Sequence, residues 1–312
     1  MRKVLVTGAS GFVGSALCRY FDEREIPYVA AVRQKLLAHQ FQIGDISSET
    51  EWSGALEGCD TVIHLAARVH VMNDETQDPL ASFRAMNVVG TMSLATQAIK
   101  LGIKRFVFVS SIKVNGEETT GKPFTAFDRP SPRDPYGKSK WEAEVGLTDL
   151  ANESGLELVV VRPPLVYGPG VGANFGRLIR LAQSGLPLPF GAIDNLRSMV
   201  GIENLVDLLS RCAKHPAAAG RVFLASDGED VSTPALFRMI ANSMGRPERL
   251  FPVPPWLCAA FANALGQSDV AQRLLGSLQV DIGYTRTTLE WVPAVSLKDG
   301  VQRTVRRFTN KL

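Results

Sequence analysis

Residues 3–14, "KVLVTGASGFVG", join a short apolar run to a glycine-rich segment. The run has the length and β-branched composition of a buried strand, and "SALCRYFDERE" after it carries apolar side chains at helical spacing. Gly8, Gly11 and Gly14 leave room for a ligand to approach the backbone, where the N–H groups of the first helical turn are free. The segment therefore predicts a strand–turn–helix unit that binds the pyrophosphate of a dinucleotide.

Strand-like and helix-like segments alternate through the first half of the chain. The runs "YVAAVR", "TVIHLAA", "RFVFVSS" and "VVVRPPLVYG" have strand length, and Pro163 and Pro164 stop the last one. Between two of them, "MNVVGTMSLATQAIKLG" predicts a helix that ends at Gly102, a typical C-cap. Continuous apolar runs that alternate with helices indicate a parallel sheet covered on both faces. We therefore expect an α/β chain with a doubly wound, Rossmann-type parallel sheet.

The pattern changes after Gly168. Glycine and proline become dense in "GPGVGANFGRLIRLAQSGLPLPFGAIDN", and short helical pieces with proline-rich turns follow. The segments "MVGIENLVDLLSRCAKHP" and "RVFLAS" suit a helix and a strand that return to the first domain. We expect a nucleotide-binding domain at residues 1–168, joined by about 200–226, and a smaller, mixed substrate-binding lobe at residues 169–199 and 227–312.

Composition excludes several classes of function. With 34 Lys+Arg against 31 Asp+Glu the net charge is only +3, which argues against a nucleic-acid partner. The four cysteines form no Cys-x-x-Cys pair, so we expect no metal site and no disulfide framework, and a reducing, cytoplasmic location fits. Three prolines break the apolar stretch "FPVPPWLCAAFANALG", and what remains is too short to span a bilayer. We therefore expect no membrane insertion.

The ends of the second and third expected strands bear on the choice of cofactor. Many NAD-binding folds place an acid at the end of the second strand to hold the ribose 2′-hydroxyl. Here "YVAAVRQK" offers Arg33 and no acid, which favours the 2′-phosphate of NADP(H) over NAD(H); the alternative is a solvated arginine. Asp45, in "GDI", follows the third expected strand and would lie beside the adenine, unless it only caps a helix or a turn.

Two segments carry candidate acid–base chemistry. In "DPYGKSK", Tyr136 and Lys140 are about one helical turn apart and share a face. An adjacent ammonium group lowers the pKa of a tyrosine from its usual value near 10, which makes it a usable acid or base. Ser110 and Ser111 end the strand "RFVFVSS", so one of their hydroxyls can orient a substrate oxygen. His64, at the end of another buried strand, is better explained as a packed residue than as a base.

The chain resembles the extended short-chain dehydrogenase/reductases of the nucleotide-sugar epimerase/dehydratase family. The motifs that carry this resemblance run nearly end to end: "VTGASGFVG", "GDI", "VIHLAA", "NVVGT", "VSS", "YGKSK", "RPPLVYGPG", "RSMVGIENLVD" and "LEWVPAVSLKDGV". In that family the catalytic serine lies 25 residues before the tyrosine, which selects Ser111 over Ser110. The resemblance also implies a homodimer formed through two helices.

The resemblance assigns further residues to binding. It places Asn87 near the active site and Pro163 beside the nicotinamide, and it implies that Asn174 and Arg197 contact the diphosphate of a UDP-sugar. A guanidinium group pairs well with a pyrophosphate. The predicted cofactor-binding residues are Gly8, Ser10, Gly11, Phe12, Val13, Gly14, Arg33, Asp45, Ile46, Leu65, Ala66, Ala67, Asn87, Tyr136, Lys140 and Pro163.

Within the family, the residues near Ser111 narrow the reaction. The similar 4,6-dehydratases carry Thr-Asp-Glu where this chain has Ser111, Ile112 and Lys113, so elimination is disfavoured. The similar 3,5-epimerase/reductases use a cysteine near the site, and this chain has none between Cys59 and Cys212. Two reactions at sugar C4 remain, and both use Ser111 with the Tyr-Lys couple.

The first reaction is reduction of a UDP-4-keto-6-deoxy-N-acetylhexosamine, as in O-antigen sugar synthesis. The segments "SSIKVNGE" and "RPPLVYGPGVGANF" are most similar to such C4 reductases, and Arg33 suits NADPH. The alternative is 4-epimerisation of a UDP-hexose or UDP-N-acetylhexosamine. A non-catalytic NADP-binding regulator is the alternative of another class, and the presence of Ser111, Tyr136 and Lys140 together argues against it.

Overall fold

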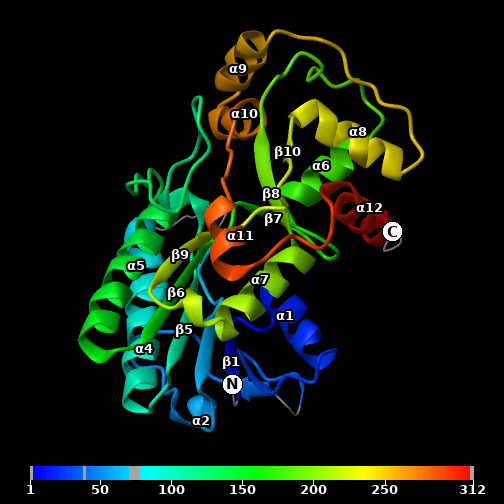
Figure 1. Ribbon diagram of the computed structural model, residues 1–312. Coiled ribbons are helices and arrows are strands. Elements are labelled where there is room, and N and C mark those ends of the chain that lie inside the picture. Colours follow the sequence, from blue (N-terminus) through cyan, green and yellow to red (C-terminus); the bar gives the residue numbers. More distant parts are fainter. Residues whose placement is uncertain (1–2, 38–39, 70–77, 310–312) are drawn as a thin grey trace.

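The fold centres on a seven-stranded parallel sheet, seen in a computed structural model that describes residues 3–37, 40–69 and 78–309 (Figure 1). Its strand order is β3-β2-β1-β4-β5-β6-β9. The register aligns Thr7 of β1 with His64 of β4 and Phe108 of β5, so the carboxyl ends of the central strands lie at one edge. The strands are β1 Val4–Thr7, β2 Tyr28–Val32, β3 Gln40–Gln42, β4 Thr61–His64, β5 Arg105–Val109, β6 Glu157–Arg162 and β9 Arg221–Leu224.

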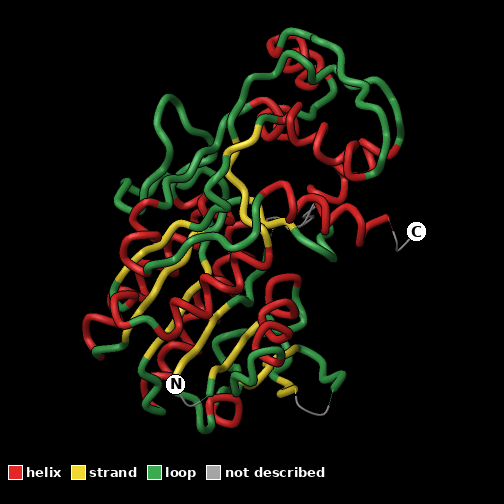
Figure 2. The backbone as a smooth tube through the Cα atoms, turned by 45° about the vertical axis from the view of Figure 1, so that its right-hand side comes forward, coloured by secondary structure: helices red, strands yellow, loops and turns green. Residues whose placement is uncertain are grey.

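Helices cover both faces of this sheet (Figure 2). Alternate residues of β1 divide between two apolar clusters: Val4 and Val6 pack with α1 and α7, whereas Leu5 packs with α4 and α5. Burial on both faces explains why the strands are continuous apolar runs. The helices are α1 Phe12–Asp22, α2 Ser53–Leu56, α3 Pro79–Arg84, the π-helix η1 Ala85–Gly90, α4 Thr91–Lys100, the 3₁₀ helix η2 Ile112–Val114, α5 Pro135–Ser154, α6 Ala173–Gln183, α7 Ile202–Lys214, the 3₁₀ helix η3 Pro216–Ala218, α8 Thr233–Ser243, α9 Pro255–Ala264, α10 Ser268–Leu275, α11 Gly283–Leu289 and α12 Leu297–Thr309.

A smaller mixed sheet lies beyond the carboxyl edge of the large one. Strand β8, Arg197–Gly201, pairs in parallel with β7, Leu165–Tyr167, and antiparallel with β10, Asp230–Val231. A third apolar cluster packs this sheet against α6, α8 and α12. The predicted fold class, a Rossmann-type parallel sheet with a smaller mixed lobe, is confirmed. The exact division into domains stays a prediction.

Two local features differ from the expected pattern. The helix expected over "MNVVGTMSLATQAIKLG" begins with the π-helix η1 before α4, and the expected strand "VVVRPPLVYG" is two strands separated by its prolines. A proline has no N–H to donate to a sheet, which explains the break. None of the described helices is both long enough and apolar enough to cross a membrane.

Candidate active site

The turn between β1 and α1 accepts only glycine at two positions. Gly8 has φ +65°, and a Cβ there would lie 2.8 Å from the nitrogen of Ala66. A Cβ on Gly14 would lie 2.1 Å from the carbonyl oxygen of Gly8. The bare turn leaves the first N–H groups of α1 for an anion, so it fits a dinucleotide pyrophosphate. A cavity of about 1010 Å³ adjoins it and is lined in part by Ser10, Gly11 and Phe12.

A chain of buried hydrogen bonds fixes the loop after β4. Thr7 Oγ1 accepts from the N–H groups of Leu65 and Ala66, both at 3.2 Å, and lies 2.7 Å from His64 Nδ1. Thr91 Oγ1 donates to a backbone carbonyl and accepts from His64 Nε2 at 3.0 Å. Burial, and then the charge of Lys140, lower the pKa of His64 to about 3. His64 is therefore a neutral, packed residue that holds this loop against the glycine turn.

Arg33 and Asp45 lie close to each other at the carboxyl ends of β2 and β3. Their side chains are exposed and form an ion pair at 3.8 Å. The carbonyl of Asp45 accepts a hydrogen bond from Thr50, so this residue also belongs to a turn. Such an exposed pair is weak, and the guanidinium group remains able to turn toward an added phosphate. The neighbouring Ile46 lies against Gly90, where a Cβ would be only 2.5 Å from Ile46 Cγ2.

The serine pair follows β5 at the same edge. Ser110 donates its N–H to Val161 at 2.8 Å, and its buried hydroxyl has no partner among the described residues. Ser111 begins η2, and its Oγ accepts from the N–H of Lys113 at 3.3 Å. The N–H of Ile112 donates to the carbonyl oxygen of Pro163 at 3.0 Å. The structure thus brings the predicted residues Ser111 and Pro163 together, although they are 52 residues apart (163 − 111 = 52).

The amino terminus of α5 is fixed next to this serine segment. Asp134 caps the helix by accepting from the N–H of Gly137 at 2.6 Å, and Pro135 occupies its first turn. The ammonium group of Lys113 pairs with the carboxylate of Asp134. A Cβ on Gly137 would lie 3.0 Å from the carbonyl oxygen of Lys113, so the two segments are in close contact. These contacts set the position of Tyr136 relative to the serine segment.

Lys140 is buried one turn after Tyr136, with only 2% of its surface exposed. Its Nζ donates to the carbonyl oxygen of Val109 at 2.9 Å and lies 4.5 Å from the centre of the Phe108 ring. Burial lowers the pKa of Lys140 to about 7, and the charge of Glu144 opposes this change. The lysine therefore titrates near neutral pH.

The pKa of Tyr136 differs from the sequence-based expectation. Although part of the residue is solvent-accessible, burial of the phenol group, and then the charge of Asp134, raise its pKa above the usual value. The expected lowering by Lys140 was wrong, because the ammonium group is directed to the Val109 carbonyl oxygen. Among the described residues, Tyr136 Oη has no hydrogen-bond partner, and the Phe83 ring packs edge-on at 5.9 Å.

Asn87, in the π-helix, links the loop after β4 to helix α5. Its Oδ1 accepts from the N–H of Arg68 at 2.8 Å, and its Nδ2 donates to the carbonyl oxygen of Arg68 and to Ser139 Oγ, both at 3.0 Å. The predicted loop residues Leu65, Ala66 and Ala67 directly precede this contact. Asn87 thus holds the loop beside the Tyr-Lys helix, while its predicted contact with the cofactor stays a prediction.

On the substrate side, Arg197 lines a cavity of about 220 Å³. Its guanidinium group donates to the carbonyl oxygen of Gly276 at 2.9 Å, and burial, and then the charge of Arg273, lower its pKa. Asn174 lies in the first turn of α6, but its side chain is outside the described residues. The remaining lining residues are Leu165, Arg177, Leu178, Leu181, Met199, Val231, Ser232, Thr233, Leu236, Phe237, Arg273 and Leu274.

Two of these cations, Arg177 and Arg273, were missed by the sequence analysis. They come from α6 and α10, whereas Arg197 begins β8. No shared motif or spacing connects the three in the sequence. Three guanidinium groups around one small cavity favour a ligand with more than one negative charge.

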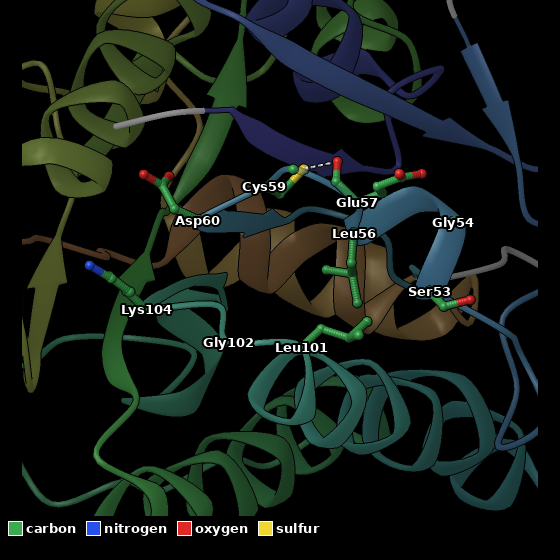
Figure 3. A pocket seen from close by; sticks show the side chains of 10 residues that line it. Ser53, Gly54, Leu56, Glu57, Cys59, Asp60, Leu101, Gly102 and Lys104 are labelled. Carbon is green, nitrogen blue, oxygen red and sulfur yellow. Dashed lines mark hydrogen bonds between the residues drawn. The ribbon is translucent and has the colours of Figure 1, made fainter.

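A third cavity, of about 650 Å³, lies at the opposite edge of the large sheet (Figure 3). Its wall includes Glu57, Cys59 and Asp60, just before β4, and Leu101 and Lys104, just before β5. Ligands of open parallel sheets bind outside the carboxyl ends of the strands, and this cavity is at the amino ends. It contains none of the predicted site residues.

Comparison with known proteins agrees with this arrangement. The model of a family described as NAD dependent epimerase/dehydratase matches residues 4–225. A UDP-glucose 4-epimerase of Vibrio cholerae is 46% identical over 98% of this chain and 95% of its own length. An N-acetyl-alpha-D-glucosaminyl-diphospho-ditrans,octacis-undecaprenol 4-epimerase of Escherichia coli O157:H7 is 30% identical over 80% of this chain and 76% of its own.

A solved structure shares the whole fold. The UDP-glucuronic acid 4-epimerase of Bacillus cereus, crystallised in complex with NAD, superposes with a TM-score of 0.80 over 99% of both chains, at 22% identity. The likeness at this identity concerns the fold alone.

Proposed function

The chain belongs to the NAD-dependent epimerase/dehydratase family of nucleotide-sugar enzymes, and we propose that it acts as a 4-epimerase on a UDP-linked hexose. The observation that carries the proposal is the 46% identity, over 98% of the chain, to a UDP-glucose 4-epimerase. The site supports it, because Ser111, Tyr136 and Lys140 lie at the carboxyl edge of the sheet beside the glycine turn.

Each residue of the site has a defined task in this reaction. Tyr136 Oη takes the proton of the C4 hydroxyl as hydride leaves C4, and returns it when hydride comes back to the other face. Ser111 already accepts a hydrogen bond from Lys113, so its hydroxyl hydrogen is free for the C4 oxygen. Tyr136 must be ionised to take this proton, so the Lys140 ammonium group, one turn away, would have to turn from the Val109 carbonyl oxygen toward the phenol to lower the Tyr136 pKa. When bound, the nicotinamide supplies the acceptor and the donor of the hydride.

The three arginines suit the nucleotide end of such a substrate. Arg177, Arg197 and Arg273 surround the 220 Å³ cavity and match the double negative charge of a diphosphate. Leu165 contributes to the same wall and directly follows Pro163 and Pro164. A UDP-sugar held there would extend its sugar toward Ser111, which contacts the Pro163 segment through Ile112.

A specific observation favours a second candidate, C4 reduction of a UDP-4-keto-6-deoxy-N-acetylhexosamine. The end of β2 carries exposed Arg33 and no acid, which suits the 2′-phosphate of NADPH. A reductase releases its oxidised cofactor after each turnover, whereas a 4-epimerase reuses the same bound cofactor. Preference for NADP(H) would therefore accompany the reductase reaction.

One pair of assays separates the two reactions. In the first assay, the purified protein is incubated with UDP-glucose without added cofactor, and formation of UDP-galactose is followed by NMR. In the second assay, the protein receives the UDP-4-keto-6-deoxy sugar with NADPH, and the absorbance of the reduced nicotinamide is followed. Interconversion supports the 4-epimerase. Stoichiometric NADPH oxidation without interconversion refutes it in favour of the reductase.

The Tyr136→Phe variant tests the catalytic assignment in either reaction. Loss of the phenolic proton should lower kcat by about 10²–10⁴-fold. Tyr28→Phe is the matched control, because the Tyr28 hydroxyl donates to Asp22, the last residue of α1, away from the glycine turn. Equal activity of Tyr136→Phe and the control would refute the proposed catalytic role of Tyr136.

A further inference from the structure

A half-buried cluster of three charges lies where the serine segment meets the amino terminus of α5. The ammonium group of Lys113, in η2, pairs with the carboxylate of Asp134, the N-cap residue of α5, and lies 3.7 Å from the carboxylate of Glu117. The side chains of Lys113, Asp134 and Glu117 are 28%, 18% and 24% exposed. Partly buried charges are screened less by solvent than exposed ones, so this cluster acts on neighbouring groups.

The cluster contacts both segments that carry the proposed reaction. Lys113 follows Ser111 by two residues and donates its N–H to Ser111 Oγ at 3.3 Å. Asp134 precedes Tyr136 by two residues and accepts from the N–H of Gly137 at 2.6 Å. A Cβ on Gly137 would lie 3.3 Å from the Cβ of Lys113, so the side chain of Lys113 begins directly against the first turn of α5. The ion pair therefore joins the serine segment to the helix of the tyrosine.

The charge of Asp134 is unfavourable for an ionised Tyr136. Burial of the phenol group, and then this carboxylate, raise the pKa of Tyr136 above its usual value. A tyrosine must be ionised before it can take a proton, so a carboxylate two residues away opposes that step. The ammonium group of Lys113 partly cancels the effect of the carboxylate at the phenol. Without it, the carboxylates of Asp134 and Glu117 would both be uncompensated.

The other charges around Tyr136 have different partners. On α5 itself, the ammonium group of Lys140 is directed to the carbonyl oxygen of Val109. Of the described residues, Lys113 is the one cation that forms an ion pair with Asp134. The other titratable groups on the elements packed around Tyr136 are neutral His64 of β4, Arg68 in the loop after β4, which lies over the Phe83 ring, Arg84 of α3 paired with Glu142 of α5, Glu144 of α5 paired with Arg162 of β6, and exposed Lys138 of α5.

We propose that Lys113 is a positioning residue for the reaction at C4: it neutralises the Asp134 carboxylate, so that this acid can cap α5 and hold Tyr136 without opposing ionisation of the phenol. Lys113 acts through Asp134 and is not itself assigned to the substrate. The proposal rests on the proton relay proposed for Tyr136. An asparagine would cap the helix nearly as well as the aspartate without adding a charge, so cap and charge can be separated by substitution.

The pH dependence of kcat distinguishes a role of charge from a role in packing alone. In the proposed 4-epimerase reaction, kcat rises with pH as Tyr136 ionises. Lys113→Gln should move this rise to higher pH by about 0.5–1 pH unit, which lowers kcat below the rise by about three- to tenfold. KM should change little, because Lys113 acts on the tyrosine and not on the bound substrate.

A pair of variants tests whether the two charges cancel. Asp134→Asn should move the rise to lower pH, because it retains the cap and removes the negative charge. The double variant Lys113→Gln/Asp134→Asn should bring the rise back close to that of the unmodified protein, and Lys113→Arg should retain it. Arg133→Gln is the matched control: it removes a cation next to Asp134 in the sequence, but Arg133 is exposed and pairs with Glu118 at 3.3 Å, so the profile should stay unchanged.

A second measurement needs neither cofactor nor activity. A fluorinated tyrosine placed at position 136 ionises at lower pH than tyrosine, so absorbance can follow its titration in the folded protein. The pKa of this residue should be higher with Lys113→Gln and lower with Asp134→Asn than in the otherwise unmodified protein. This titration decides the inference about Lys113 separately from the assays of the two C4 reactions.

Two results would overturn the proposal. The first is the same pKa of the fluorinated tyrosine in Lys113→Gln and in Arg133→Gln. The second is a double variant that is as impaired as Lys113→Gln, because the ion pair would then act only by holding the two segments together. A failure of the proposed function would appear differently, as unchanged activity of Tyr136→Phe while the titration still shifts with Lys113→Gln.

Discussion

Lys140 should lower the stability of the folded protein at neutral pH, so Lys140→Met should stabilise the protein while it removes activity. Burial lowers the pKa of this lysine from 10.5 to about 7. Between these values the unfolded chain holds a proton that the folded protein has released. Wild-type stability therefore rises with pH across the window from about 7 to 10.5, and below pH 7 the full penalty remains.

The size of the effect follows from these pKa values. A difference of about 3.5 in pKa corresponds to about 5 kcal/mol, of which about 4 kcal/mol applies at pH 7, where the folded lysine is half protonated. Methionine fills a similar volume but leaves the Val109 carbonyl oxygen without its donor, which costs about 2 kcal/mol. Lys140→Met should therefore be more stable by about 2 kcal/mol at pH 7 and less stable by about 1 kcal/mol at pH 10.

Urea denaturation of the cofactor-free protein at several pH values between 6 and 10 measures this difference. Lys138→Met is the matched control, because Lys138 lies exposed on the same helix and its replacement should give a small difference that hardly changes with pH. The reasoning would be refuted if the difference in free energy of unfolding between Lys140→Met and wild type did not change with pH. It would also be refuted by a variant that is less stable than wild type at every pH.

Three further outcomes are expected. Glu144→Gln should destabilise the protein by about 3–5 kcal/mol in urea denaturation, because it leaves buried Arg162 without its carboxylate partner; replacing both by leucine should be far milder. Gly14→Ala should abolish cofactor binding, followed by nicotinamide fluorescence, because its Cβ would lie 2.1 Å from the Gly8 carbonyl oxygen; retained binding would contradict the tight turn. Arg33→Asp should lower the ratio of NADPH to NADH affinity at least about tenfold, and an unchanged ratio would exclude Arg33 from 2′-phosphate recognition.

Most of the fold and the glycine turn were predictable because they depend on local pattern. Buried strands of a parallel sheet are continuous apolar runs, so β1, β4, β5 and β6 were visible as such. The glycine turn needs positive φ at Gly8 and no side chain at Gly14, and the sequence shows both requirements because glycine stands at these positions. The division into domains and the role of each site residue stay predictions.

What the sequence did not predict depends on residues that meet only in three dimensions. Arg177, Arg197 and Arg273 lie on three separate elements, and nothing in their spacing indicates that they line one cavity. The pKa of Tyr136 has the opposite direction to the expected one, because burial and the direction of the Lys140 ammonium group decide it. The exposure of α9 was also hidden, since an apolar, charge-free segment normally predicts a buried helix.

The two candidate reactions differ in how the cofactor is used and not in the residues proposed for catalysis. In the mechanism proposed above, epimerisation and reduction at C4 both use the hydroxyl of Ser111 and the proton relay of Tyr136. They differ in whether the cofactor is retained or exchanged at each turnover, and this property belongs to the cofactor-binding edge formed by the glycine turn, Arg33 and Asp45. Because the Arg33–Asp45 ion pair is exposed and weak, the Arg33 guanidinium group can leave Asp45 for a cofactor phosphate at little cost. Substitutions at this edge should therefore alter the balance of the two reactions more than conservative changes around Tyr136.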